Sequence, residues 1–223
     1  MESPRPRWQP VGRGLAPCWA TLSLLFAAPA IAGDSTNPEP VLEEPWTLGA
    51  SIFWYLAPGQ KNFWVLNASA DHGPIHLEVR YHDEFIGTGS ALIGWKLEFG
   101  ETIKLGLTPS VGCLIGDQGG PIIGLDLDLG WGPLSFTSQL ESLWEVQTGK
   151  GWFFLAWTEL DVRPWSWVRA GIVAQRTQLF HTAREFVFGP LVGFTVWKVD
   201  FSFYWFQPGG IDQTFAAKLE SSF

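Results

Sequence analysis

The chain is poor in charged residues and cysteines, and it has one long uncharged apolar stretch, close to its N-terminus. Only 16% of its 223 residues are charged, whereas soluble domains average about 25%, which disfavours an ordinary cytosolic enzyme. A helical membrane protein is also disfavoured, because each span of a helix bundle needs about 20 apolar residues. The two cysteines, Cys18 and Cys113, exclude a disulfide scaffold and a cysteine-based zinc site.

Basic residues are also scarce. The chain has 14 Lys and Arg against 22 Asp and Glu, a formal charge of -8. A nucleic-acid partner would require clustered basic residues on one face, so no such partner is expected. Tryptophan and glycine are abundant instead, with 14 Trp and 25 Gly.

The N-terminal region has the features of an export signal. Three arginines precede an apolar stretch over residues 20–32, which ends in the small-x-small pattern of a secretory cleavage site. We therefore predict a cleaved signal peptide over residues 1–32. Residues 33–45 combine prolines and acids with few apolar side chains, a composition that predicts a flexible periplasmic leader.

From residue 46 onward, apolar residues recur at every second position. For example, Ile75, Leu77 and Val79 alternate with Glu78 and Arg80. Such alternation predicts strands with one face in an apolar medium and the other in a polar one. The predicted strands lie near residues 46–57, 62–71, 74–82, 85–98, 101–114, 120–131, 133–146, 151–162, 165–177, 184–197, 199–206 and 212–223.

These segments predict an all-β fold, a single antiparallel up-and-down transmembrane β-barrel over residues 46–223. We expect about 12 strands, with 10 or 14 as alternatives. An even number places both termini on one side, the periplasmic side. A soluble barrel also alternates, but tryptophans gathered at both ends of the strands indicate the two aromatic belts of a bilayer. The predicted girdle is Trp46, Trp54, Trp95, Trp131, Trp144, Trp152 and Trp205.

The last predicted strand carries a further pattern. Phe215, Ala217, Leu219 and Phe223 share one parity, and Phe223 ends the chain. In this the chain resembles Gram-negative outer-membrane β-barrel proteins, whose final strand commonly ends in Phe with apolar residues at alternate positions. Ser221 departs from that pattern. The resemblance implies recognition by the barrel-assembly machinery and contact with outer-membrane lipids, including lipopolysaccharide.

If the apolar parity faces lipid, the other parity lines the lumen. Acids exceed bases there, and carboxylates favour cations, so we predict a small porin-like channel for polar or cationic small solutes, without a cofactor or metal. Opposite charges could instead pair across the lumen and plug it. The candidate pore-lining residues are Glu78, Arg80, His82, Lys96, Lys104, Asp126, Asp128, Glu141, Glu159, Asp161, Arg163, Arg169 and Lys218.

Two other classes remain open. An outer-membrane lipid-modifying or proteolytic enzyme would need a histidine at the extracellular rim, where His82 and His181 are best placed. No catalytic or metal-binding spacing links them, so the chain is predicted not to be an enzyme. A non-conducting scaffold could bind a partner through the basic segment 176–184.

Overall fold

The fold is known from a computed structural model. It describes residues 45–56, 58, 62–82, 88–116, 119–146, 151–179, 185–210 and 212–223. The chain divides into residues 1–41, which lie outside the described part, and residues 42–223, which contain the barrel. The predicted signal peptide and all of the leader except residue 45 therefore also lie outside it. The described residues form no helix that is long and apolar enough to cross a membrane.

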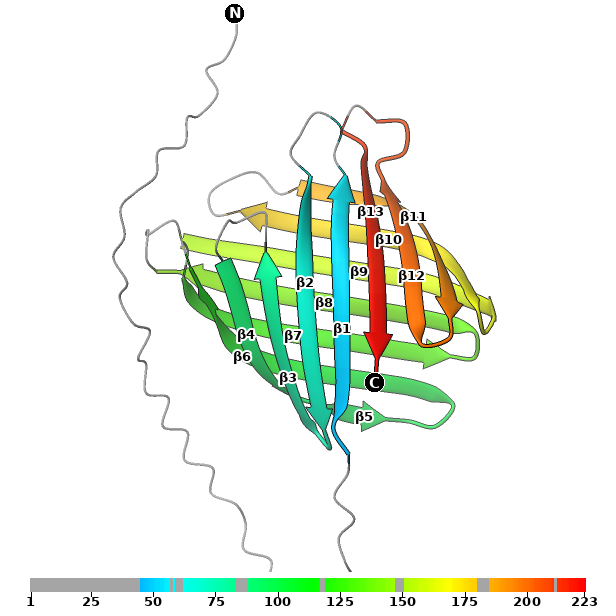
Figure 1. The fold of residues 1–223 in the computed structure, drawn as a ribbon, viewed down its shortest axis with the longest axis horizontal. Helices are drawn as coiled ribbons and strands as arrows, with labels where there is room; N and C mark the ends of the chain where they lie inside the picture. Colours follow the sequence, from blue (N-terminus) through cyan, green and yellow to red (C-terminus); the bar gives the residue numbers. More distant parts are fainter. Residues whose placement is uncertain are drawn as a thin grey trace, which may run out of the picture. The chain divides into compact units, whose positions relative to one another are not determined.

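All regular secondary structure in the described residues is β-strand (Figure 1). The strands are β1 (Thr47–Leu56), β2 (Phe63–His72), β3 (Ile75–His82), β4 (Thr88–Trp95), β5 (Leu97–Phe99), β6 (Ile103–Ile115), β7 (Gly120–Trp131), β8 (Leu134–Glu145), β9 (Gly151–Trp165), β10 (Val168–Leu179), β11 (Glu185–Val196), β12 (Val199–Phe206) and β13 (Thr214–Ser222). One predicted strand is interrupted at Lys96, giving β4 and β5. Both pair with β6, so the barrel has the predicted twelve strands.

The sheet is antiparallel throughout and closes on itself. Strand β1 pairs with β13, and β4 joins β3 to β6. Leu48 and Phe223 exchange two backbone hydrogen bonds of 3.0 and 2.8 Å, which join the start of the first strand to the end of the chain. Figure 1 shows β1, β2 and β13 on the near wall, with β7, β8 and β9 crossing behind them in a different direction. Tilted strands of this kind are needed to close a barrel.

Short hairpins define one end of the barrel, which we call the turn end. Gly73 and Gly132 each begin a two-residue turn that continues with proline, and their φ angles are 53° and 56°. This is the position at which a two-residue hairpin turn favours glycine. The turn between β11 and β12 has Trp197 with φ 61° instead. The opposite end, where β1 ends and β2 begins, is called the loop end.

Alternate residues of each strand face opposite sides of the wall. The outward set is apolar and exposed, as at Val79, Ile123 and Ile172. The inward set contains nearly all of the charged strand residues, but it also contains two apolar clusters. The outward apolar surface and the inward charges follow the predicted parity, and the inward apolar clusters do not.

Candidate functional site

Apolar side chains form two buried clusters in the loop-end half of the lumen. One cluster contains Trp157, Tyr204 and Phe206, each less than 8% exposed, together with inward aliphatic residues of β10 and β11. A second cluster contains Leu92 and Ile122, with Leu143 of β8. We call these two clusters the apolar compartment. Its core residues are buried.

Aromatic rings cross the lumen at the edge of the apolar compartment. The rings of Phe53 and Trp157 meet edge to face, with centroids 5.6 Å apart. Phe53 is on β1 and Trp157 on β9, with four strands between them along the wall. Trp157 also packs against Tyr204, at 5.1 Å between centroids. The contact between Phe53 and Trp157 is therefore a bridge across the lumen rather than between neighbouring strands.

A charged bridge crosses the lumen beside the aromatic one. Arg80 on β3 donates hydrogen bonds to both carboxylate oxygens of Glu78, at 2.5 and 2.8 Å. It also donates to Glu141 on β8, and β4, β6 and β7 lie between β3 and β8 in the wall. All three side chains are less than 15% exposed. A guanidinium that serves two carboxylates satisfies charges that could not lie unpaired in this place.

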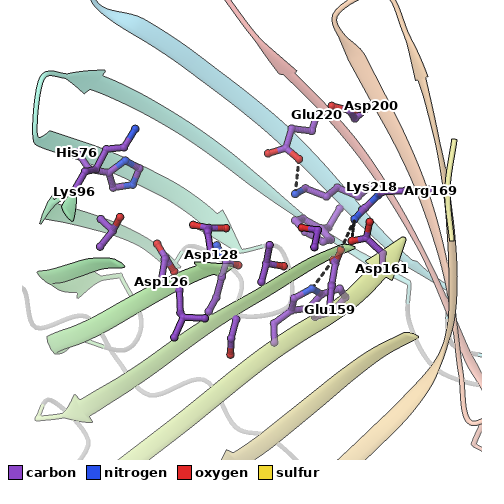
Figure 2. Close-up of a pocket in the computed structure, with 18 of the residues that line it drawn as sticks. His76, Lys96, Asp126, Asp128, Glu159, Asp161, Arg169, Asp200, Lys218 and Glu220 are labelled. Atoms are coloured by element: carbon purple, nitrogen blue, oxygen red, sulfur yellow. Dashed lines mark hydrogen bonds and ion pairs between the residues drawn. The ribbon is translucent and has the colours of Figure 1, made fainter. Parts of the chain in front are cut away.

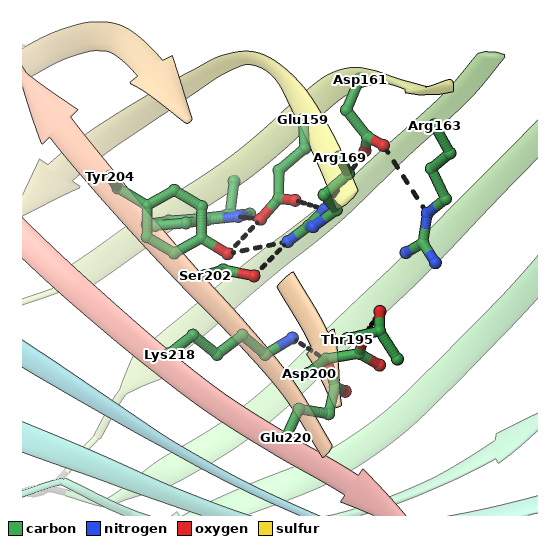
Figure 3. Close-up of polar contacts among 11 residues, drawn as sticks. Glu159, Asp161, Arg163, Arg169, Thr195, Asp200, Ser202, Tyr204, Lys218 and Glu220 are labelled. Carbon is green, nitrogen blue, oxygen red and sulfur yellow. Dashed lines mark hydrogen bonds and ion pairs between the residues drawn. The ribbon is translucent and has the colours of Figure 1, made fainter. Parts of the chain in front are cut away.

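Arg169 organises a second polar network on the opposite wall (Figure 3). Its Nη1 donates to Glu159 at 2.7 Å and to Asp161 at 3.2 Å, and its Nη2 donates to Ser202 at 2.7 Å. Glu159 also accepts hydrogen bonds from Trp157 and Tyr204, at 2.8 and 2.9 Å. The aromatic side chains of the apolar compartment are thereby tied to the charged network next to it.

The space for Arg169 depends on a glycine of the neighbouring strand β11. A Cβ atom at Gly193 would lie 2.8 Å from both Cγ and Nε of Arg169. Cβ atoms in protein structures essentially never lie this close to another heavy atom. Gly193 therefore lets the guanidinium reach Glu159 without a clash.

A polar cavity of about 370 Å³ occupies the turn-end half of the lumen (Figure 2). We call it the charged compartment. Its wall includes seven acidic and four basic side chains, with Phe53 and Trp157 at its inner limit. The charged residues are Asp71, Lys96, Asp126, Asp128, Glu159, Asp161, Arg163, Arg169, Asp200, Lys218 and Glu220. Arg163 and Glu220 are about half exposed, at 47% and 49%, so the compartment opens to solvent.

Two carboxylates in this compartment lack direct partners. Figure 2 shows Asp126 and Asp128 between His76 and Lys96 on one side and Glu159 and Arg169 on the other. Among the described residues, no hydrogen bond or ion pair joins Asp126 or Asp128 to another side chain. Their negative charges are therefore available to a cation in the cavity.

The predicted pore-lining residues fall into four groups. Lys96, Asp126, Asp128, Glu159, Asp161, Arg163, Arg169 and Lys218 line the charged compartment. Glu78, Arg80 and Glu141 form the charged bridge. Lys104 is exposed near the turn end, and His82 is partly buried near the loop end of β3. His181 and most of the segment 176–184 beyond β10 lie outside the described residues.

The predicted girdle residues lie near the two ends of the strands. Six of them are at least 40% exposed, and Trp152, opposite Trp144 on the neighbouring strand, is partly buried. Sequence reasoning omitted Trp165 and Trp167, which stack at 6.1 Å near the turn end, and Trp197, which is 97% exposed. Trp167 and Trp197 lie in hairpin turns and Trp165 ends β9, so tryptophan in or beside a hairpin turn was a usable signal.

Three residues of the predicted assembly signal share the outer face of β13, and Phe223 directly follows the strand. Phe215, Leu219 and Phe223 are exposed and Ala217 is partly buried, while Ala216 faces the lumen. Their recognition by the barrel-assembly machinery remains a prediction.

Comparison with solved structures relates this geometry to known barrels. The chain is similar to the KdgM porin, with 9% identity and a TM-score of 0.58 over 78% of this chain and 99% of that one. It is also similar to the NanC porin, with 10% identity and a TM-score of 0.53 over 78% and 98%. No family model and no curated protein matches it. The chain therefore has the closed antiparallel barrel fold found in these porins.

Proposed function

We propose that the protein is a porin-like channel of the bacterial outer membrane that takes small polar or cationic solutes into its lumen. The charged compartment carries the proposal, because seven acidic side chains face four basic ones around a water-accessible cavity. Carboxylates in a channel favour cations. The outward apolar surface and the porin fold support a membrane location.

The proposed path is crossed by the contact between Phe53 and Trp157 and by the bridge from Arg80 to Glu141. These contacts also favour a second candidate, a barrel that binds solutes without conducting them. In that case the charged compartment would act as a binding site open at one end.

Planar-bilayer recordings on the refolded protein separate the two candidates. A channel gives single-channel conductance, and in a salt gradient its zero-current potential shows a preference for cations. The double variant Asp126→Asn with Asp128→Asn removes the two unpaired charges and lowers that preference. Glu101→Gln, which neutralises an exposed carboxylate in the turn between β5 and β6, is the matched control and leaves it unchanged.

The recordings can also contradict the proposal. A correctly folded barrel with no conductance above leak would rule out the channel and favour the barrel that binds solutes without conducting them. Conductance with an anion preference would retain the channel and reject cationic solutes.

A further inference from the structure

Three side chains able to ligate a metal ion meet at the wall of the charged compartment. His76, Glu78 and Asp126 each offer a ligand atom, and these atoms all lie within 4.8 Å of one another. His76 and Glu78 come from β3, and Asp126 comes from β7, with β4 and β6 between the two strands in the wall. His76 and Asp126 also line the cavity, so solutes in the cavity can reach the cluster.

A hydrogen bond orients the His76 ring toward the other two groups. Its Nδ1 lies 2.6 Å from a carboxylate oxygen of Asp71, and its Nε2 lies 3.7 Å from Oε2 of Glu78. Histidines that ligate metals commonly donate their second ring N–H to a carboxylate, which fixes the tautomer and the ring orientation. With Nδ1 as the donor to Asp71, Nε2 presents its lone pair to the cluster.

The charges around the cluster do not balance. Five carboxylates face two basic groups, which leaves an excess of three negative charges when His76 is neutral. They are Asp71, Glu78, Asp126, Asp128 and Glu141 against Arg80 and Lys96. A divalent cation would offset two of the three. Arg80 already contacts Glu78, but a carboxylate has about four lone-pair sites and can accept a further partner.

We propose that His76, Glu78 and Asp126 bind one divalent transition-metal ion such as Zn²⁺. Imidazole with carboxylates suits ions of this class better than Mg²⁺ or Ca²⁺. Two ligands of one tetrahedral Zn²⁺ lie about 3.4 Å apart. The ligand atoms lie within 4.8 Å of one another, so side-chain rotations that shorten these separations by up to about 1.4 Å bring them into place. The fourth position is left for water from the cavity.

For the proposed channel, the site indicates divalent transition-metal ions as a class of cation that enters the lumen. Any role of the site in transport rests on that proposed function. Metal binding itself requires only the folded barrel. The test is therefore a calorimetric titration of Zn²⁺ into the refolded protein in detergent micelles, with folding of each variant checked by heat-modifiable gel migration.

We expect one Zn²⁺ per wild-type barrel. Asp71→Asn, which weakens only the orientation of His76, should lower the affinity by about tenfold, and His76→Ala or Asp126→Asn should lower it further. His82→Ala is the matched control, because His82 faces inward from the same strand outside the cluster, and it should bind Zn²⁺ like the wild type. Asp126→Asn preserves side-chain volume and keeps the test valid if His76→Ala does not fold.

The absence of saturable Zn²⁺ binding to the folded wild type would overturn the proposal. So would affinity retained in both His76→Ala and Asp126→Asn. Zn²⁺ binding without conductance would keep the metal site and contradict the channel, and conductance without Zn²⁺ binding would do the reverse.

Discussion

The two halves of the lumen differ in the side chains that the same barrel wall turns inward. In the loop-end half, aromatic and aliphatic residues such as Tyr204, Phe206 and Leu191 pack on each other and are almost completely buried. In the turn-end half, carboxylates, guanidinium groups and hydroxyl groups surround a cavity of about 370 Å³. The charged half requires ion pairs or water, because buried charges need partners or solvent.

The boundary between the halves is a single layer. Trp157 packs on Phe53 and donates a hydrogen bond to Glu159, two residues further along β9. The ammonium group of Lys218 lies 5.1 Å from the centre of the Phe53 ring. Apolar packing and charge pairing therefore share residues, and a change in this layer should affect both stability and passage.

The largest expected effect comes from removing the aromatic bridge. Trp157→Ala should lower the free energy of unfolding by about 4 kcal/mol, because a fully buried aromatic side chain is lost and a cavity remains. If the barrel conducts, the variant should also open the layer that Phe53 and Trp157 form across the lumen and raise single-channel conductance. Denaturant titration in micelles followed by circular dichroism, and bilayer recordings, measure the two effects.

Trp144→Ala is the control for this change, since Trp144 lies near the loop end but faces outward and is 57% exposed. It should leave conductance unchanged and cost less stability. Equal losses of stability in the two variants would contradict the structural role given to the apolar compartment.

The second largest loss of stability is expected in the charged compartment. Arg169→Met leaves Glu159 and Asp161 buried without their common partner, and breaking a buried ion pair in this way costs about 3 kcal/mol. The same denaturant titration measures it. Arg163→Met is the comparison, because the Arg163 side chain is 47% exposed and its Nε is 3.9 Å from Asp161. Exposed pairs contribute about 0 to 1 kcal/mol, so similar losses in both variants would contradict the network in Figure 3.

The smallest expected loss of stability comes from a comparison of the outer wall with the lumen. Ile172 faces outward on β10 and is 59% exposed. If this surface meets lipid, Ile172→Arg should cost about 2 kcal/mol, measured by unfolding from lipid vesicles. Ser135→Arg, which lines the charged compartment, should be tolerated better. A neutral effect at Ile172 would mean that the outer surface does not meet lipid.

Much of the fold could be predicted from local patterns. The alternation in β3 and β7 identified the face that carries Glu78, Arg80, Asp126 and Asp128, and the structure turns that face inward. Glycine followed by proline occupies two of the hairpin turns. The interruption at Lys96 was missed, because a break of one residue does not disturb the alternation on either side.

The interior of the lumen could be predicted only in part. Phe53 and Trp157 have the same parity as the charged residues, and sequence reasoning assigned the large apolar side chains to the outer face. The hydrogen bond between Arg80 and Glu141, 61 residues apart, and the proximity of His76 to Asp126 follow no spacing in the chain. The proposed metal site could not be found from the sequence for that reason, and no metal was predicted.

The sequence by itself determined which face of each strand is apolar and where the chain turns, because side chains alternate along any extended backbone and hairpin turns have their own residue preferences. Only the tertiary structure decided which inward side chains meet. Those meetings depend on strand tilt, on register and on the diameter at which the sheet closes. Together these bring β1 opposite β9 and β3 opposite β8, and divide one continuous inner face into an apolar compartment and a charged compartment.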